Sequence, residues 1–342
     1  MMRAAVLVEP GRFEIEDRPI PKPGRGEALI KIARVGICGT DLHIFNGHYA
    51  SDKLPLIPGH EFTGTIAAVG SDVVGLNVGS NAVVDMNIGC GHCYWCRRNE
   101  ILNCPDMQQM GISMDGAFAD YMVVPARLVI PAPDDVPFDV LALTEPLACV
   151  VRAARKAQIT FGQSVLVIGA GPIGNLHVQL LRTIGAAPII VADISSDRVD
   201  MAVECGADIG VSDPAQLTQA VLDATDGRGV DVVIESVGQP ALYRTALHLI
   251  RKGGHVAAFG LTGPEDFLDM PILDTILREN SIKGSVAGMG QDMHDALTLL
   301  THRRILTGRF CGSSFPLTEI QNAFDSIKDR PADLKTQVVM AH

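Results

Sequence analysis

The amino-acid sequence predicts an α/β protein with two domains, the first mostly β and the second built on a doubly wound parallel sheet. Its 342 residues are enough for about two domains, each with its own core. Short apolar or alternating segments, separated by glycine and proline, fill the first 148 residues. From about residue 144, nearly all-apolar strands alternate with amphipathic helices, which is typical of a parallel sheet covered on both faces.

The strands expected in the first half are short and separated by turns. They lie at residues 3–8, 28–35, 62–69, 81–85 and 119–124. Such a pattern indicates an irregular antiparallel barrel or sandwich. The cysteine-rich insert at 90–104 is too short and too polar to belong to the core.

The second half begins with a helix near residue 144, followed by six strands with helices between them. The strands are expected at 164–169, 188–193, 208–212, 230–238, 255–260 and 281–286, and the helices at 172–184, 196–205, 216–225 and 241–250. Two later helices (292–303 and 317–327) and a strand (335–340) are too few to form a domain. We therefore expect one discontinuous domain, 1–148 with 290–342, and a second domain at 149–289.

Composition excludes several classes of function. The net charge of −11 disfavours nucleic acid or an anionic membrane as a partner, because both require a basic surface. No apolar run reaches the length of about 18 residues that a transmembrane helix needs. The first residues turn acidic too soon for a signal peptide, so the eight cysteines indicate a reducing compartment, the cytoplasm by default.

The residues from Gly36 to Glu61 gather side chains that bind metals. They are Cys38, Thr40, Asp41, His43, His48, His60 and Glu61. Thiolate, imidazole and carboxylate are zinc ligands, and a catalytic zinc site uses three protein ligands with one position open. The alternative is that the cysteine is buried packing and the histidines lie on the surface.

Four cysteines in the insert have the spacing C-x2-C-x2-C-x7-C. They are Cys90, Cys93, Cys96 and Cys104. Four thiolates so close in sequence predict a closed, tetrahedral zinc site of the structural type. A ferredoxin-like iron–sulfur cluster also uses clustered cysteines, but the chain lacks a second run of cysteines and a cluster-binding fold around this one. A nucleic-acid-binding zinc ribbon conflicts with the acidic charge. The isolated Cys149, Cys205 and Cys311 are expected to be inert packing residues.

A dinucleotide motif, GAGPIG, follows the first strand of the second half. It contains Gly169, Gly171, Pro172, Ile173 and Gly174, and the next helix starts within it. The three glycines permit a tight turn, close approach of a pyrophosphate, and close packing of helix on strand. The helix N-terminus then binds the anion.

The end of the next strand indicates which dinucleotide binds. Asp193 lies nineteen positions after Gly174, where a carboxylate accepts hydrogen bonds from ribose hydroxyls and repels a 2′-phosphate. NAD is therefore favoured over NADP. Arg198 is suited either to stacking on the adenine or to accommodating a phosphate.

These motifs together resemble the zinc-containing medium-chain dehydrogenases/reductases, in the branch of the sorbitol (polyol) and L-threonine 3-dehydrogenases. The matching segments are GICGTDLH (36–43), PGHE (58–61), the four-cysteine lobe, TEPLAC (144–149) and GAGPIG (169–174), which span nearly the whole chain. The resemblance implies a GroES-like catalytic domain, a Rossmann NAD-binding domain, two zinc ions per subunit, a small-molecule alcohol substrate and a homodimer or homotetramer.

The resemblance also implies the roles of individual residues. Cys38 and His60 are catalytic-zinc ligands, Glu61 is a third ligand or exchanges with water, and Glu145 lies beside the metal. Thr40 and His43 relay the alcohol proton, and Ser285 lies near the nicotinamide. Adjacent residues of an extended segment point in opposite directions, so His60 and Glu61 require a local kink to bind one ion. Glu145 could instead be a helix N-terminal carboxylate, and Thr40 and His43 turn-capping residues.

The sequence indicates the substrate less clearly than it indicates the metal and cofactor sites. Sorbitol dehydrogenases carry an Arg–Tyr pair where this chain has Ala287 and Gly288, so its pocket is expected to be wider and less polar there. We expect a secondary alcohol of a polyol, sugar acid or sugar derivative, with His48, Tyr49 and Phe118 as candidates for the pocket wall. L-threonine or a small diol is the alternative substrate.

Two further functions remain open. A zinc-free, quinone-reductase-like enzyme would lack Cys38, His60 and the four-cysteine lobe, all of which this chain has. A non-catalytic dinucleotide sensor would have no need of a proton relay.

Overall fold

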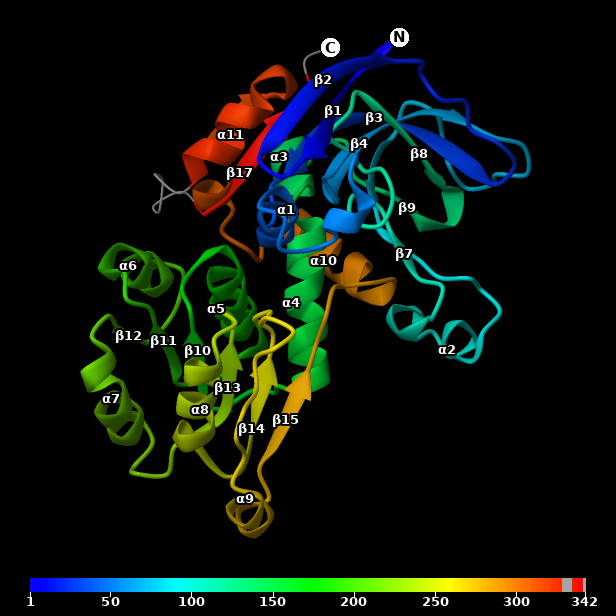
Figure 1. Ribbon diagram of the computed structural model, residues 1–342. Coiled ribbons are helices and arrows are strands. Elements are labelled where there is room, and N and C mark those ends of the chain that lie inside the picture. Colours follow the sequence, from blue (N-terminus) through cyan, green and yellow to red (C-terminus); the bar gives the residue numbers. More distant parts are fainter. Residues whose placement is uncertain (328–333, 341–342) are drawn as a thin grey trace. The chain divides into compact units, whose positions relative to one another are not determined.

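The structure, a computed structural model, describes residues 1–327 and 334–340 and divides into two compact units (Figure 1). The first unit comprises Met1–Ala148, Gly288–Arg303 and Thr307–His342. The second comprises Cys149–Ala287 and Arg304–Leu306.

The first unit is built on a seven-stranded sheet. Six strands follow the order β16-β17-β3-β4-β5-β9, and β8 pairs with β3 beside this path. Their bounds are β3 Glu27–Gly36, β4 Glu61–Val69, β5 Asn81–Val84, β8 Tyr121–Pro125, β9 Val129–Pro131, β16 Ser313–Pro316 and β17 Thr336–Val339. All pairs are antiparallel except β16 with β17. The mostly-β first half expected from the sequence is confirmed.

The register of three strands determines where the first candidate site lies. In the antiparallel pair β3–β4, Gly36 lies opposite Glu61, so the end of β3 lies beside the start of β4. The tail strand β17 pairs with the other edge of β3, with Gln337 opposite Gly36. Residues from three distant parts of the chain therefore meet at Gly36.

The first unit has several smaller elements beside this sheet. They are the hairpin β1 (Met2–Glu9) and β2 (Arg12–Arg18), the pair β6 (Asn87–Ile88) and β7 (Gln108–Gln109), and helices α1 (Gly39–Phe45), α2 (Tyr94–Arg97), α3 (Phe138–Leu141), α4 (Thr144–Ala157, which continues into the second unit), α10 (Gln291–Thr301) and α11 (Ile320–Ser326). The ring of Phe324 on α11 lies 4.9 Å from Phe13 and 5.0 Å from Phe45, measured between centroids. The tail therefore packs on the first half of the chain through an aromatic cluster.

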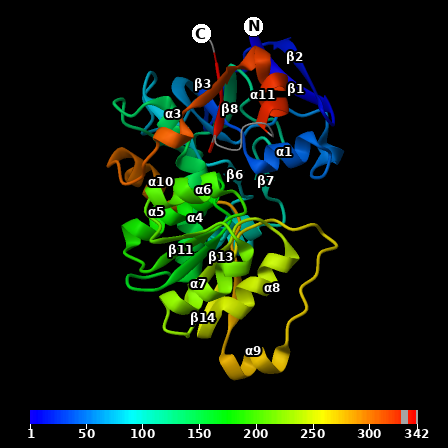
Figure 2. The same ribbon diagram turned by 90° about the vertical axis from the view of Figure 1, so that its left-hand side faces the viewer.

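The second unit has the six-stranded parallel sheet predicted from the sequence, with helices packed on it (Figure 2). Its order is β12-β11-β10-β13-β14-β15. The strands are β10 Val165–Ile168, β11 Ile189–Ala192, β12 Ile209–Val211, β13 Val230–Glu235, β14 Ile250–Ala258 and β15 Ser281–Gly284. The main helices are α5 Pro172–Ile184, α6 Ser196–Glu204, α7 Leu217–Ala224 and α8 Pro240–Leu249. Strand order reverses between β10 and β13, where open sheets of this type bind ligands.

Several features differ from the sequence prediction. Strands β2 and β16 were not expected, and β14 begins at Ile250 and not at residue 255. Helix α9 (Ile272–Arg278) is a further element that the sequence did not predict; it has only seven residues, and its apolar side chains are exposed. The helix expected at 317–327 is a 3-10 turn, Leu317–Glu319, followed by α11. Residues 304–306 belong to the second unit, where the amide of Gln179 bonds both the N–H and the carbonyl of Leu306. Among the helices of the described residues, none combines the length and apolarity needed to cross a membrane.

Candidate metal centres and dinucleotide site

One buried carboxylate, that of Asp41, ties together two turns of the first candidate site. It is fully buried on α1 and accepts hydrogen bonds from the backbone N–H groups of Cys38 (2.9 Å) and Gly59 (3.2 Å). Its Oδ1 also lies 3.3 Å from Nδ1 of His60. Cys38 precedes α1 and His60 precedes β4, so Asp41 joins the ends of the two strands β3 and β4.

Cys38, His60 and Glu61 offer three ligand atoms that all lie within 4.8 Å of one another. His60 and Glu61 are buried, and Cys38 is half-buried. The backbone turn that this requires lies at Gly59, whose φ of 94° is in the left-handed region, immediately before the pair. A thiolate, an imidazole and a carboxylate that converge in a buried site fit a divalent zinc ion.

The charges around His60 act in opposite directions on its pKa. Burial lowers the pKa of His60, but the charges of Asp41 and Cys38 outweigh burial and raise the pKa well above its ordinary value. Because Asp41 faces Nδ1, Nε2 is the imidazole nitrogen left to face a metal.

A lysine from the tail completes the charge balance of this centre. Nζ of Lys335 donates to Oε1 of Glu61 at 2.6 Å and also contacts Oε2. Burial lowers the pKa of Lys335, but the charges of Glu61, Cys38 and Glu145 raise it overall. Glu145, in the first turn of α4, is buried, but among the described residues it does not belong to the three-ligand group.

The other residues predicted around this site have different environments. Thr40 and His43 lie three positions apart on α1, and His43 is exposed. His48 and Tyr49 are also exposed. Phe118 is fully buried, and its ring lies where a side chain at Gly59 would have to be. The expectation that Phe118 lines the substrate pocket is therefore wrong, because the aromatic cluster and Gly59 enclose it.

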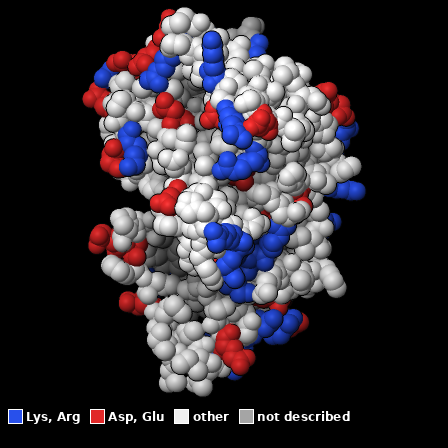
Figure 3. Space-filling model, turned by 90° about the vertical axis from the view of Figure 1, so that its right-hand side faces the viewer, with Lys and Arg blue, Asp and Glu red and all other residues white. Residues whose placement is uncertain are grey.

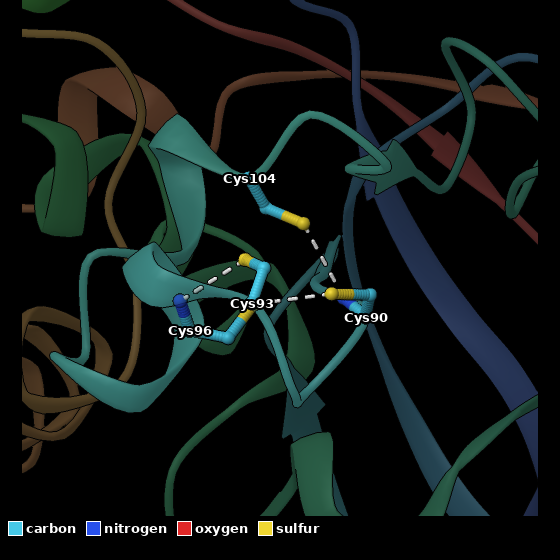
Figure 4. A group of neighbouring side chains, drawn as sticks. All are labelled: Cys90, Cys93, Cys96 and Cys104. Carbon is cyan, nitrogen blue, oxygen red and sulfur yellow. Dashed lines mark hydrogen bonds between the residues drawn. The ribbon is translucent and has the colours of Figure 1, made fainter.

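The second candidate metal centre is the four-cysteine lobe. The sulfur atoms of Cys90, Cys93, Cys96 and Cys104 all lie within 4.8 Å of one another and point toward a common centre (Figure 4). Backbone N–H groups donate to two of them: Cys90 to the Sγ of Cys104 at 3.5 Å, and Cys96 to the Sγ of Cys93 at 3.4 Å. Sγ of Cys90 lies 4.0 Å from Sγ of Cys96, too far for a disulfide. Four sulfur donors in this arrangement fit a closed zinc site.

The thiol environments in this lobe are unequal. Backbone N–H groups of His92 and Cys93 lower the pKa of Cys90 to about 6, whereas desolvation raises the pKa of Cys96 to about 12. The isolated cysteines differ again: Cys149 is buried, and burial raises the pKa of Cys311 to about 12. Neither Cys149 nor Cys311 belongs to a candidate metal group among the described residues, as expected for packing residues.

Two polar side chains connect the base of the cysteine lobe to the segment that follows β15. The amide nitrogen of Asn87 donates to Oδ1 of Asp85 and to the carbonyl of Gly288, both at 2.9 Å. The other oxygen of Asp85 accepts from the N–H of Gly290 at 2.8 Å. Residues 288–290 are thereby held on the first unit beside the lobe.

In the second unit, the three glycines of the dinucleotide motif meet different steric demands. Gly169 has φ of 98°, and a Cβ there would lie 2.7 Å from Val237. A Cβ at Gly174 would overlap the carbonyl oxygen of Gly169, whereas a Cβ at Gly171 would meet no atom within 4 Å. Helix α5 begins at Pro172, with Gly171 as its N-cap and no side chain on the cap. The N-terminus of α5 is therefore open to an anion.

Polar side chains at the ends of β11 and β13 stabilise this glycine turn. Asp193 accepts hydrogen bonds from the N–H groups of Ala170 (2.8 Å) and Ser195 (2.9 Å), one on each carboxylate oxygen. The hydroxyl of Ser236 donates to the carbonyl of Ile168 at 2.8 Å. Arg198 lies on α6 and is half-buried.

The end of β15 carries an unpartnered hydroxyl. Oγ of Ser285 is buried, and none of the described atoms forms a hydrogen bond with it. The chain then passes through Ala287, whose φ of 51° is left-handed, into Gly288. Gly288 packs so closely on the backbone of Ala148 that a Cβ would not fit.

Comparison with known proteins assigns both halves of the chain. Residues 24–134 match the alcohol dehydrogenase GroES-like domain, and residues 172–302 match the zinc-binding dehydrogenase domain. Together these matches cover more than half of the chain. The chain belongs to the zinc-binding dehydrogenase family.

Named relatives and a solved structure support this assignment over most of the chain. L-threonine 3-dehydrogenase of Pyrococcus horikoshii is 38% identical over 76% of each chain. Sorbitol dehydrogenase of Halalkalibacterium halodurans is 32% identical over 94% of each chain. The alcohol dehydrogenase rspB from Escherichia coli CFT073, solved in complex with NADH, is 28% identical and has a TM-score of 0.92 over 99% of each chain.

Some residues of these sites were not assigned a role from the sequence. Asp41 had a local signal, because it follows Cys38 by three residues, the spacing of a helix capping box. Lys335 and Asn87 had none, because their partners Glu61 and Gly288 lie 274 and 201 residues away.

Alanine substitutions at two glycines of the dinucleotide motif should affect different properties, stability in one case and dinucleotide binding in the other. Gly174→Ala should destabilise the protein by about 1–3 kcal/mol, because the methyl group overpacks the contact of α5 with the Gly169 turn. Gly171→Ala should change stability little, because its methyl group points into open space, but should weaken binding of a dinucleotide. Urea unfolding and a fluorescence titration with NADH measure both effects. Equal destabilisation by the two variants would contradict the steric assignment.

Loss of one sulfur ligand should remove the metal from the cysteine lobe. Cys96→Ser should lower bound zinc by roughly half and reduce the unfolding temperature, because a structural zinc contributes directly to folding. Cys311→Ser is the matched control, since Cys311 belongs to neither metal group among the described residues. Elemental analysis and thermal unfolding provide the measurement. Full zinc content in Cys96→Ser would rule out the site.

Proposed function

We propose that this chain is a zinc-dependent dehydrogenase that transfers a hydride from a secondary alcohol to NAD. The observation that carries the proposal is the convergence of Cys38, His60 and Glu61 in a chain that also has the dinucleotide turn. A zinc-dependent alcohol oxidation needs a metal centre and a dinucleotide site. The metal helps the hydroxyl to lose its proton, and the dinucleotide accepts the hydride.

Cys38, His60 and Glu61 would hold the catalytic zinc, with Glu145 close enough to affect the centre through its charge. Zinc bound there acts as a Lewis acid and lowers the pKa of an alcohol. Asp41 orients the imidazole of His60 so that its Nε2 is presented, and the same carboxylate fixes the backbone of Cys38. A second zinc, in the four-cysteine lobe, has a structural role.

Thr40 and His43 are proposed to carry the alcohol proton to solvent. They lie three positions apart on α1, so they share one face of the helix. Thr40 is half-buried and His43 is exposed, which suits a path that leads from the site to water.

The second unit is proposed to bind NAD through Gly169, Gly171, Pro172, Ile173 and Gly174. The N-terminus of α5 supplies unpaired N–H groups for the pyrophosphate.

Three side chains of the same unit are proposed to recognise the rest of the cofactor. Asp193 accepts one backbone hydrogen bond on each oxygen, which orients the carboxylate and leaves lone pairs for ribose hydroxyls. Arg198 is close in sequence and is proposed to contact the adenosine end. Ser285 supplies an unpartnered hydroxyl at the end of β15 for the nicotinamide amide group.

The proposed substrate is a secondary alcohol of a polyol, sugar acid or sugar derivative. Relatives named sorbitol dehydrogenase support a polyol, and relatives named L-threonine 3-dehydrogenase support L-threonine as the alternative, beside a small diol. The close packing of Gly288 on Ala148 excludes a side chain there, which favours a pocket without the Arg–Tyr pair of sorbitol dehydrogenases.

Zinc-loaded protein should form NADH from one hydroxy compound in a panel of polyols, sugar acids, diols and L-threonine, each tested with NAD and NADP. A chelator should abolish the activity. Cys38→Ser should lower turnover by about a thousandfold, since the metal supplies several kcal/mol of stabilisation, and should leave NADH binding intact. Activity of Cys38→Ser equal to that of the unmodified enzyme would refute the zinc role. No turnover across the panel, with NADH still bound, would favour a dinucleotide sensor.

The enzyme is also proposed to form a homodimer or homotetramer in the cytoplasm. Within the described residues, β15 is the last strand of its sheet and pairs with β14 alone. The adjacent segment exposes large apolar side chains: Leu261, Phe267, Ile272, Leu273, Ile276 and Leu277. The part of the molecule around α9 in Figure 1 is correspondingly mostly uncharged in Figure 3. A free edge strand beside an apolar face suits a second copy related by a two-fold axis.

Ile276→Glu should therefore shift the protein to a smaller species, because it places a charge in the proposed interface. Phe161→Glu is the control, since Phe161 is also an exposed apolar residue, at a different position in the same unit. Light scattering after size exclusion gives the mass. A monomeric unmodified protein, or the same mass for both variants and the unmodified chain, would contradict the proposed interface.

A further inference from the structure

Lys335 is a buried lysine whose ammonium group pairs with the carboxylate of Glu61, a candidate metal ligand. The residue is 7% exposed and immediately precedes β17. Its Nζ bonds Oε1 of Glu61 at 2.6 Å and contacts Oε2 as well, so both carboxylate oxygens face the same cation. A buried ammonium is costly unless it is paired, and Glu61 supplies the partner.

The sheet builds this ion pair into the fold. Strand β17 pairs with β3, and the N–H of Ile37 donates to the carbonyl of Thr336 at 2.9 Å. Gly36 lies opposite Glu61 in the pair β3–β4. A Cβ at Gly36 would overlap the Glu61 carboxylate and would lie 2.9 Å from Cε of Lys335. The absence of a side chain at Gly36 therefore leaves room for the pair.

The three candidate ligands consequently differ in how freely they can bind a metal. Nε2 of His60 is oriented by Asp41 on the opposite side of the ring, and Cys38 is fixed through its backbone by the same carboxylate. Glu61 alone has its ligand oxygens shared with a cation. A carboxylate that already neutralises an ammonium is a weaker ligand than a free one.

We propose that Lys335 is a positioning residue that competes with the metal for the carboxylate of Glu61 and so keeps that ligand position exchangeable. The proposal rests on the proposed function, because it requires a metal at Cys38 and His60. Cys38 and His60 would then be permanent ligands, whereas Glu61 could be replaced by water or by the substrate hydroxyl. A purely structural role, in which Lys335 only neutralises buried charge and anchors β17, is the alternative.

The two roles predict different effects on metal binding. Lys335→Met removes the cation but keeps much of the side-chain volume. If Lys335 competes for Glu61, removing it should raise the affinity of the Cys38 centre for its metal ion by about tenfold. This is the lower end of the effects that residues in contact with metal ligands have on metal affinity. The ion at this centre is identified as the one that Cys38→Ser does not bind. The visible spectrum of bound Co²⁺ should change toward a higher coordination number, and kcat should fall more than KM rises, because the exchangeable position is closed.

A double variant separates competition for Glu61 from a general effect of charge. In the Glu61→Gln background, Lys335→Met should leave the affinity for Co²⁺ within about twofold, because the amide is a poor ligand and the competition is absent. Lys335→Arg keeps the charge and should reproduce the affinity of the unmodified protein. Lys53→Met, at an exposed lysine paired with Asp52, controls for the loss of one positive charge.

Chelator competition with Zn²⁺ and Co²⁺ titration of the whole chain provide the readouts. Unchanged or weaker metal binding in Lys335→Met, or an equal gain in the Glu61→Gln background, would overturn the proposal and leave the structural role. If Lys335→Met does not fold, a tenfold gain in Lys335→Arg over the unmodified protein would also overturn it, because arginine keeps the competing charge. Absence of any Cys38-dependent metal ion in the unmodified chain would instead refute the proposed function.

Discussion

The candidate catalytic centre depends on the buried carboxylate of Asp41. This group accepts from two backbone N–H groups, of Cys38 and Gly59, and lies beside the imidazole of His60. A fully buried carboxylate is stable only where such donors surround it. Because the donors come from two different turns, satisfying Asp41 also places the thiol and the imidazole on the same side of the sheet end. The placement of Cys38 and His60 therefore depends on the hydrogen-bonding requirement of one carboxylate.

Close packing around glycines gives this arrangement its precision. The ring of Phe118 fills the space beside Gly59, and the pair of Glu61 with Lys335 fills the space beside Gly36. Neither position can accept a side chain without moving a residue of the site. The aromatic cluster around Phe118 and Phe324 therefore supports the turn that carries His60.

The cysteine lobe contributes to more than its own stability. Asn87, at its base, bonds the carbonyl of Gly288, and Asp85 bonds the N–H of Gly290. A metal that rigidifies the lobe therefore also stabilises the hydrogen bonds that hold residues 288–290.

The sequence by itself determined the features whose partners are near in the chain. The six parallel strands, the start of α5 at Pro172 and the four-cysteine group follow from spacing within a few residues, since backbone geometry fixes which of these can meet. The tertiary structure alone decided the pairing of Lys335 with Glu61, the return of 304–306 to the second unit and the exposed face of α9. Each depends on strand register or on packing between segments more than a hundred residues apart, or on what remains uncovered after folding. No local pattern encodes such contacts, because they arise only when the whole sheet has formed.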